Sequence, residues 1–242
     1  MSTLLKTFLF VTTFVATGFA QTPATQPATA PAAASSSFDA ELASIDALAL
    51  AHRDLSASFV QEKHSALLRK PLVSKGRVFA KGPLTLWVTE SPEVSRMLID
   101  PQWLRLYYPK QKVVEEYPVR GQMSAMASSP LPALGAIRGN FTIMPDAGDG
   151  LDPIEPAGRT KAIRLDPIGD LKPFVGFVRV LLEADRGLVL TFEVTDPDGE
   201  RTTVRFTDLQ PDRGLTDRDL QLDVPAGTKV VRPVGDQMPD RP

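Results

Sequence analysis

The sequence has no cysteine, only two histidines and no apolar run long enough to cross a bilayer. Without cysteine, the chain forms no disulfide, holds no thiolate-bound metal and offers no thiol for catalysis or lipid attachment. His52 and His64 fall on different predicted elements, whereas a zinc site needs three or four ligands at set spacings. We therefore predict no metal and no cofactor, and we interpret both histidines as surface residues.

The sequence also lacks a strong excess of either charge. The net charge is −2, and acidic and basic residues alternate without long runs. Such a balance provides no electrostatic footprint for nucleic acid or for an anionic lipid surface. Neither is an expected partner.

Recognisable catalytic motifs are absent as well. The sequence has no G-x-x-x-x-G-K-[ST] loop, no G-x-S-x-G elbow and no H-E-x-x-H helix. Glu115 and Glu116 are adjacent on a predicted strand, so their carboxylates point to opposite faces and cannot act as a pair. The acids of Asp196–Glu200 resemble a Ca²⁺ loop but lack its twelfth-position Glu, which favours a hairpin turn. We predict that the protein is not an enzyme, although a dispersed carboxylate site stays open.

The N-terminus is typical of an export signal. Lys6 precedes an apolar run from Thr7 to Ala16, and small residues surround Phe19 before an expected cleavage after Ala20. The alternative, a membrane anchor, needs about 20 apolar residues, and this run is shorter. Cleavage would leave 26 basic and 29 acidic residues, a net charge of −3. The sequence therefore predicts export by a cleaved signal peptide.

Composition divides the rest of the chain. Residues 21–37 are Pro, Ala, Thr, Ser and Gln without charge, which predicts a disordered linker. One domain is expected over 38–234, followed by a flexible tail at 235–242. Its first element is a helix at Phe38–His52, where apolar residues recur at helical spacing.

Period-2 alternation dominates after this helix. It predicts strands separated by short turns, and therefore an antiparallel meander. The strands are expected at Leu55–Leu67, Lys75–Lys81, Leu84–Glu90, Val94–Asp100, Trp103–Tyr108, Val113–Val119, Ala162–Leu165, Gly176–Ala184, Leu188–Thr195, Thr202–Gln210 and Asp219–Val224.

The segment Gly121–Asn140 interrupts the meander. It carries methionines and small residues broken by Pro130 and Pro132, which predicts two short helical pieces hinged at the prolines. The predicted fold class is mainly β with helices (α+β). It is an unclosed antiparallel β-barrel of about eleven strands with an N-terminal helix and a helical lid.

The strand at Leu84–Glu90 raises the question of what its second face contacts. Leu84, Leu86 and Val88 alternate with Thr85, Trp87 and Thr89, so a large aromatic lies where alternation predicts solvent. One interpretation is an ordinary core with helices on both faces of the sheet. The other is a cavity for a hydrophobic ligand with the Met-rich segment as its lid, because methionine adapts to ligands of varied shape.

Four motifs follow one another along the chain. They are Phe59-Val60-Gln61, then Gly76, Pro83 and Trp87, then the strand from Trp103 to Pro109, and finally Pro225-Ala226-Gly227. In this order the chain resembles the periplasmic outer-membrane lipoprotein carrier proteins, the LolA-like family, over about Phe38 to Val231.

The resemblance implies a soluble periplasmic chaperone that carries lipoprotein acyl chains in a hydrophobic cavity from the inner to the outer membrane. It implies an inner-membrane ATP-driven lipoprotein-release complex and an outer-membrane lipoprotein acceptor as partners of a monomer. It also implies a basic residue that holds the lid closed, which here is Lys81. The lysine ammonium lacks the planar fork with which an arginine bonds several carbonyl groups at once. The candidate acyl-chain contacts are Phe79, Leu86, Trp87, Leu104, Leu106, Met123, Met126, Leu131, Leu134 and Ile137.

Three alternatives remain open. The protein could carry another lipid or glycolipid, since acyl chains are alike to an apolar cavity. It could be an interaction module that senses lipoproteins, although such proteins carry a further domain for which this chain has no room. It could also be purely structural.

Overall fold

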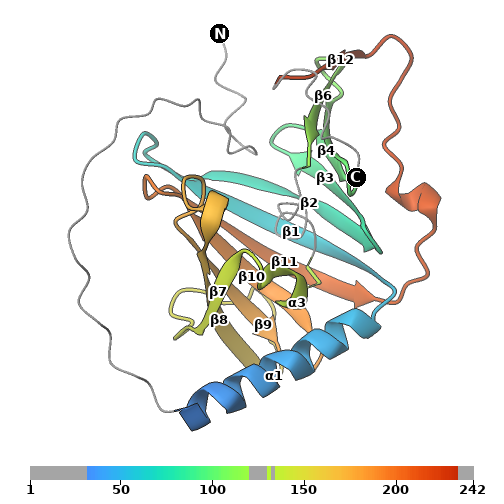
Figure 1. The fold of residues 1–242 in the computed structure, drawn as a ribbon. Coiled ribbons are helices and arrows are strands. Elements are labelled where there is room, and N and C mark those ends of the chain that lie inside the picture. Colours follow the sequence, from blue (N-terminus) through green and yellow to red (C-terminus); the bar gives the residue numbers. More distant parts are fainter. Residues whose placement is uncertain (1–31, 120–129, 132–133, 234–242) are drawn as a thin grey trace.

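The structure, a computed structural model, describes residues 32–119, 130–131 and 134–233 (Figure 1). A helix is followed by two runs of strands with a short helix between them. In chain order the elements are α1 (Ala32–Ala51), β1 (Asp54–His64), β2 (Leu72–Lys81), β3 (Leu84–Ser91), β4 (Ser95–Ile99), β5 (Trp103–Tyr108), β6 (Val113–Pro118), α3 (Leu134–Ile137), β7 (Phe141–Pro145), β8 (Thr160–Pro167), η2 (Gly169–Leu171), β9 (Phe177–Glu183), β10 (Leu188–Thr195), β11 (Arg201–Pro211), η3 (Asp217–Leu220) and β12 (Lys229–Val231).

The described strands form one curved sheet in the order β12-β6-β5-β4-β3-β2-β1-β11-β10-β9-β8-β7. Its neighbours pair antiparallel except β12, which runs parallel to β6. The first and last strands of this order do not pair with each other, so the barrel is open, as predicted. Figure 1 shows α1 lying across one end of the sheet near β9, β10 and β11.

Ten of the predicted strands correspond to β1–β6 and β8–β11, but the ends of the prediction need correction. The short strand β7 was not expected, because it ends in a proline, a residue that weakens a strand prediction. Asp219–Val224 is not a strand. Its first residues belong to η3, where the Asp219 carboxylate accepts a hydrogen bond from the backbone N–H of Thr216, and the last strand forms later, at β12.

The helix α1 begins at Ala32, six residues before the predicted start and inside the stretch assigned to the linker. Alanine has the highest helix propensity, so the Ala-rich end of that stretch continues the helix despite its lack of charge. The rest of the predicted linker, the signal peptide at 1–20 and the tail at 235–242 lie outside the described residues.

The two faces of the sheet have different covers. We call the face that carries Phe59, Val78 and Trp87 the inner face. It packs against α1 through Leu42 and Ile45 in one continuous buried cluster that α3 also joins. The opposite face, the outer face, is covered beside β2 and β3 by η3, whose Leu220 is buried.

Loop residues cover the outer face at the other end of the sheet. There Leu151, Leu181 and Leu190 form a second, smaller cluster. Both faces are therefore apolar and both are covered, which explains why the alternation in β3 gave no water-facing side. The face of Trp87 is the one that packs against the helices.

Two glycines permit close backbone approaches. A Cβ on Gly76 in β2 would lie 2.0 Å from the carbonyl oxygen of Val88 in β3. Gly187, with φ +65°, lets the turn between β9 and β10 touch α1, where a Cβ would lie 2.5 Å from the backbone N of Ala49. These contacts fix the pairing of β2 with β3 and the position of α1.

We expect Gly76→Ala to destabilise the protein by at least about 3 kcal/mol, because the new methyl group would collide with backbone that cannot move aside. Urea unfolding followed by circular dichroism measures this. Gly158→Ala is the matched control, since its Cβ would meet only side-chain ends, those of Asp185 at 3.2 Å and Glu183 at 3.7 Å. Equal stability of the two variants would contradict the proposed close approach.

Candidate functional site

Aromatic side chains gather at the centre of the inner face. The Trp87 ring lies 4.9 Å from that of Phe59, edge-on at 66°, and 5.9 Å from that of Phe206. Cross-strand neighbours on the same face are Val78 and Met97. Trp87 is 3% exposed, and its indole Nε1 has no hydrogen-bond partner among the residues that the structure describes. The result is a buried apolar and aromatic cluster at the centre of the inner face.

Glu115 and Tyr117 on β6 form a polar pair further along the same face. Glu115 is opposite Leu106 and Glu116 is opposite Arg105, which confirms that the two carboxylates point to different faces. The Tyr117 hydroxyl donates to Glu115 Oε2 at 2.9 Å. Burial and the nearby Glu115 raise the pKa of Tyr108 to about 12, so this phenol stays neutral at physiological pH.

One carboxylate of α1 holds α3. The backbone N–H of Leu134 donates to Asp46 Oδ1 at 2.8 Å, and that of Gly135 donates to Asp46 Oδ2 at 3.0 Å. The free N–H groups at a helix start need acceptors, and a negative charge there is favourable. An exposed ion pair between Arg138 and Asp39, 2.9 Å apart, adds a second contact. The two helices are therefore clipped together above the sheet.

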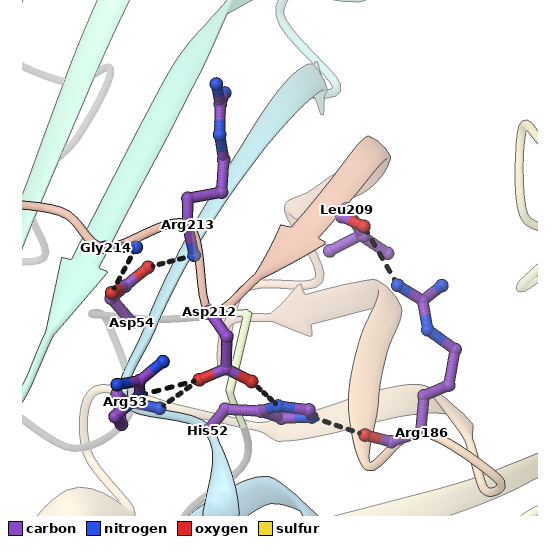
Figure 2. A network of polar contacts seen from close by, with 8 residues as sticks. All are labelled: His52, Arg53, Asp54, Arg186, Leu209, Asp212, Arg213 and Gly214. Carbon is purple, nitrogen blue, oxygen red and sulfur yellow. Dashed lines mark hydrogen bonds and ion pairs between the residues drawn. The ribbon is translucent and has the colours of Figure 1, made fainter.

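A polar network anchors the C-terminal end of α1 to the sheet (Figure 2). His52 Nδ1 lies 3.0 Å from Asp212 Oδ2, and its Nε2 lies 2.9 Å from the carbonyl oxygen of Arg186. The other Asp212 oxygen accepts from the backbone N–H of Arg53 at 2.9 Å, and this bond, with that to His52, holds the pKa of Asp212 below its ordinary value. His52 is thus a bridging residue with a side chain 17% exposed, rather than a surface histidine.

Asp54 completes this anchor. Its buried carboxylate accepts hydrogen bonds from the backbone N–H groups of Arg213, Gly214 and Leu215 at 2.8, 3.0 and 3.1 Å. The start of β1 therefore holds the chain as it leaves β11. Because α1 ends three residues earlier, the same contacts fix one end of the helix that covers the inner face.

The outer face has a cleft of about 380 Å³ with a polar lining, which includes Asp146, Asp152 and Lys161. At its edge Arg179 forms two bonds to the Asp146 carboxylate, at 2.7 and 3.1 Å. The Arg179 guanidinium holds the pKa of Asp146 below its ordinary value of 3.8. A polar cleft of this kind does not suit an acyl chain.

Five of the sequence-predicted contacts come together on or against the inner face. The side chains of Trp87, Leu106, Leu134 and Ile137 belong to the inner cluster, and Leu104 packs against it. Leu131 is half-buried beside Pro130, whose carbonyl accepts the N–H of Val189.

The other predicted residues lie elsewhere. Phe79 and Leu86 are opposite each other on the outer face, so they do not share a surface with Trp87. The Lys81 ammonium forms an ion pair with Asp217 of η3 at 2.8 Å, whereas α3 is held by Asp46. Met123 and Met126 lie outside the described residues.

Sequence reasoning missed Phe59, Phe206 and Asp46 as parts of this site. Phe59 was noticed only within a motif, although its position two residues from buried Ala57 follows the alternation of β1. Nothing in the sequence marked Asp46 as a site residue, because acidic residues commonly flank the apolar stripe of a helix on a protein surface. Its role depends on a backbone that is about 90 residues away in the sequence.

The family comparison agrees with this geometry. Residues 51–221 match the model of the family described as outer membrane lipoprotein carrier protein LolA. The chain belongs to this family. The match extends from the end of α1 to the residue after η3, so it includes the inner face and the Asp54 anchor. No curated protein matches the chain.

The chain is similar to several solved structures at low identity. An uncharacterized conserved protein from Thermus thermophilus superposes with a TM-score of 0.52 at 13% identity, over 81% of this chain and 99% of that one. A LolA superfamily protein from Nitrosomonas europaea gives 0.41 at 11% identity, over 76% and 97%. A putative outer membrane lipoprotein-sorting protein domain from Vibrio parahaemolyticus gives 0.44 at 14%, over 75% and 94%.

Two further observations apply to the part of the chain that the structure describes. None of its helices has the length and apolar character that a bilayer crossing requires. Nor do three or more histidine, aspartate or glutamate side chains gather there in a way that would hold a metal ion.

We expect Asp54→Ala to destabilise the protein by about 3 kcal/mol, because three buried backbone N–H groups would lose a charged acceptor. Asp198→Ala, in the exposed turn between β10 and β11, is the control and should change stability by less than about 0.5 kcal/mol. Chemical unfolding at neutral pH measures both. A loss for Asp54→Ala no larger than that of the control would refute the anchoring role.

The ion pair of Asp146 predicts a pH dependence. Since folding lowers the pKa of Asp146, its contribution is fully present above pH 3.8 and is lost as the pH falls through the lower value of the folded state. The difference in unfolding free energy between wild type and Asp146→Asn should therefore be largest near pH 6 and shrink below pH 4.

Urea midpoints at pH 6, 4, 3 and 2 test this expectation. Arg179→Met should flatten the same part of the profile, because it removes the partner that lowers the pKa. A constant difference between wild type and Asp146→Asn across the range would show that the pair does not act in this way.

Proposed function

We propose that the protein is a soluble periplasmic chaperone that binds the acyl chains of lipoproteins and carries them from the inner to the outer membrane. The observation that carries this proposal is the inner face, an apolar and aromatic face covered by two helices that are joined mainly by the Asp46 carboxylate and also by the exposed Asp39–Arg138 ion pair. The family to which the chain belongs supports the choice of cargo.

Burial of hydrocarbon supplies the energy. Each methylene transferred from water contributes about 0.8 kcal/mol, so one long acyl chain gains on the order of 10 kcal/mol without any catalytic group. The acyl chain would enter by displacing α3 and lying against Trp87 and its neighbours. Binding rather than chemistry is the activity that this surface supports.

The covering helices suit a carrier because cargo must also leave. If displacing a covering helix costs a few kcal/mol, cargo can both enter and leave. A helix held by many buried side chains would stay in place. The helix α3 has only four residues, and it contributes Leu134 and Ile137 to the core. In this proposal an inner-membrane ATP-driven release complex loads the protein and an outer-membrane acceptor unloads it.

Depletion in the host tests the transport role. If the proposal is right, lipoproteins accumulate at the inner membrane when the protein is removed, and native mass spectrometry of the purified protein detects acylated peptides. Unchanged sorting together with a different bound lipid would favour a carrier of another lipid or glycolipid. No uptake of any fluorescent acyl probe would leave a structural role or an interaction module.

The clip between the helices makes a separate prediction. We expect Asp46→Ala to increase the rate of uptake of a fluorescent palmitoyl probe by roughly tenfold or more, because α3 loses two charge-assisted hydrogen bonds. Stopped-flow fluorescence measures the rate. Asp39→Ala is the matched variant on the same helix, and it should change the rate less than about threefold, since an exposed pair contributes little. Equal rates for Asp46→Ala and wild type would show that α3 does not limit entry.

A further inference from the structure

The indole N–H of Trp87 is an unpaired donor in the aromatic centre of the inner face. In the described residues two buried side-chain polar atoms have no hydrogen-bond partner, Trp87 Nε1 and Asn140 Nδ2. Trp87 is only 3% exposed, so water does not satisfy its N–H from outside. A buried donor left unpaired is destabilising, and such groups are rare in folded proteins.

The contacts of the Trp87 ring are apolar, and none of the polar side chains that the structure describes, including the buried Thr85 and Thr89 on the same face of β3, accepts a hydrogen bond from this donor. Phe59 and Phe206 contact the ring, and the cross-strand neighbours Val78 and Met97 are also apolar. Phenylalanine would fill much of the same space without an unpaired N–H. An isolated internal water is a poor partner, because a buried water needs two to four polar neighbours.

We propose that Trp87 Nε1 donates a hydrogen bond to the carbonyl oxygen of the ester or amide that joins an acyl chain to its headgroup. This inference rests on the proposed function and adds a chemical class to it. The ligand would be an acyl ester or amide, distinguished from a plain hydrocarbon or an ether-linked chain. A carbonyl oxygen accepts without donating and carries no net charge, so it is buried at lower cost than a carboxylate.

The hydrogen bond would also set the depth of the ligand. With the carbonyl held at Trp87, the hydrocarbon beyond it lies along the inner face toward Leu42 and Ile45 of α1 or toward Leu104 of β5. The preference for an ester or amide would arise because a ligand without a carbonyl leaves the buried Trp87 N–H unpaired. The apolar contacts would still supply most of the affinity.

The test compares two glycerolipid probes with the same chain lengths and the same fluorophore, one with ester and one with ether linkages. The wild-type protein should bind the ester probe about tenfold more tightly, the ratio expected for one neutral hydrogen bond. Trp87→Phe should reduce this ratio to about one. The ratio is the readout because any loss of packing in the variant affects both probes equally.

Trp103→Phe is the matched control. Trp103 is the other tryptophan of the chain and lies on the outer face, where Arg232 is 5.4 Å from its ring. This variant should keep the ester preference. A ratio that is unchanged in Trp87→Phe, or near one in the wild type, would overturn the inference while leaving the carrier proposal intact. Failure of the wild type to bind either probe would overturn the carrier proposal itself.

A second measurement takes its readout from the wild-type protein. Nitrogen-15 labelling gives one indole N–H signal for each of the two tryptophans, and the signal that disappears in Trp103→Phe assigns them. The ester probe should move the Trp87 proton signal downfield and slow its exchange with solvent, whereas the ether probe should not. The same shift with both probes would refute a carbonyl acceptor.

Discussion

A sheet that does not close on itself, with apolar side chains on both faces, must be covered on both faces. This constraint organises the whole structure. The inner face receives α1 and α3, and the outer face receives η3 beside β2 and β3 and a loop that packs Leu151 against Leu181 and Leu190. Each covering element therefore buries a particular part of the sheet. The short helix α3 on the inner face is the covering element best suited to move.

The two inner helices are attached by different kinds of contact. The end of α1 is held by Asp54, His52 and Asp212, which bind backbone groups of several segments (Figure 2). The short helix α3 is held mainly by one carboxylate, Asp46, together with two apolar side chains. Buried charged groups with several backbone partners are costly to break, whereas a two-bond clip is less so. The residues that stabilise the fold at the end of α1 are thus different from those that limit the displacement of α3.

Alternation and turns made most of the fold predictable from the sequence. Ten strands and the helix after the linker follow from local patterns such as Leu84–Glu90, and the motif order led to the correct family. The direction in which each strand faces was less accessible, because Trp87 and Leu86 are both buried and period alone does not say which side meets the helices. That choice is made by partners distant in the sequence.

The polar contacts could not be predicted from the sequence for a similar reason. Lys81 was assigned as a latch by resemblance, and the structure pairs it with Asp217, more than 130 residues later. Asp46 and Asp54 accept hydrogen bonds from backbone N–H groups. Nearly every residue type has such a group, so the sequence does not show which ones bind these carboxylates. Local patterns specify elements, whereas long-range pairs specify which groups hold them together.

The buried polar anchor of α1 lies at its C-terminal end, whereas Glu41 nearer the other end forms partly exposed ion pairs with Arg159 and Lys161, which contribute less, so this helix is suited to act as a lever. Its 20 residues span about 30 Å, and the fulcrum lies near Arg53, where the anchoring carboxylates are. A tilt of about 10° at the fulcrum would displace the far end by roughly 5 Å, about the width of one hydrocarbon chain. A small angular change close to rigid backbone would thus become a wide aperture at the opposite end, without unfolding a single turn.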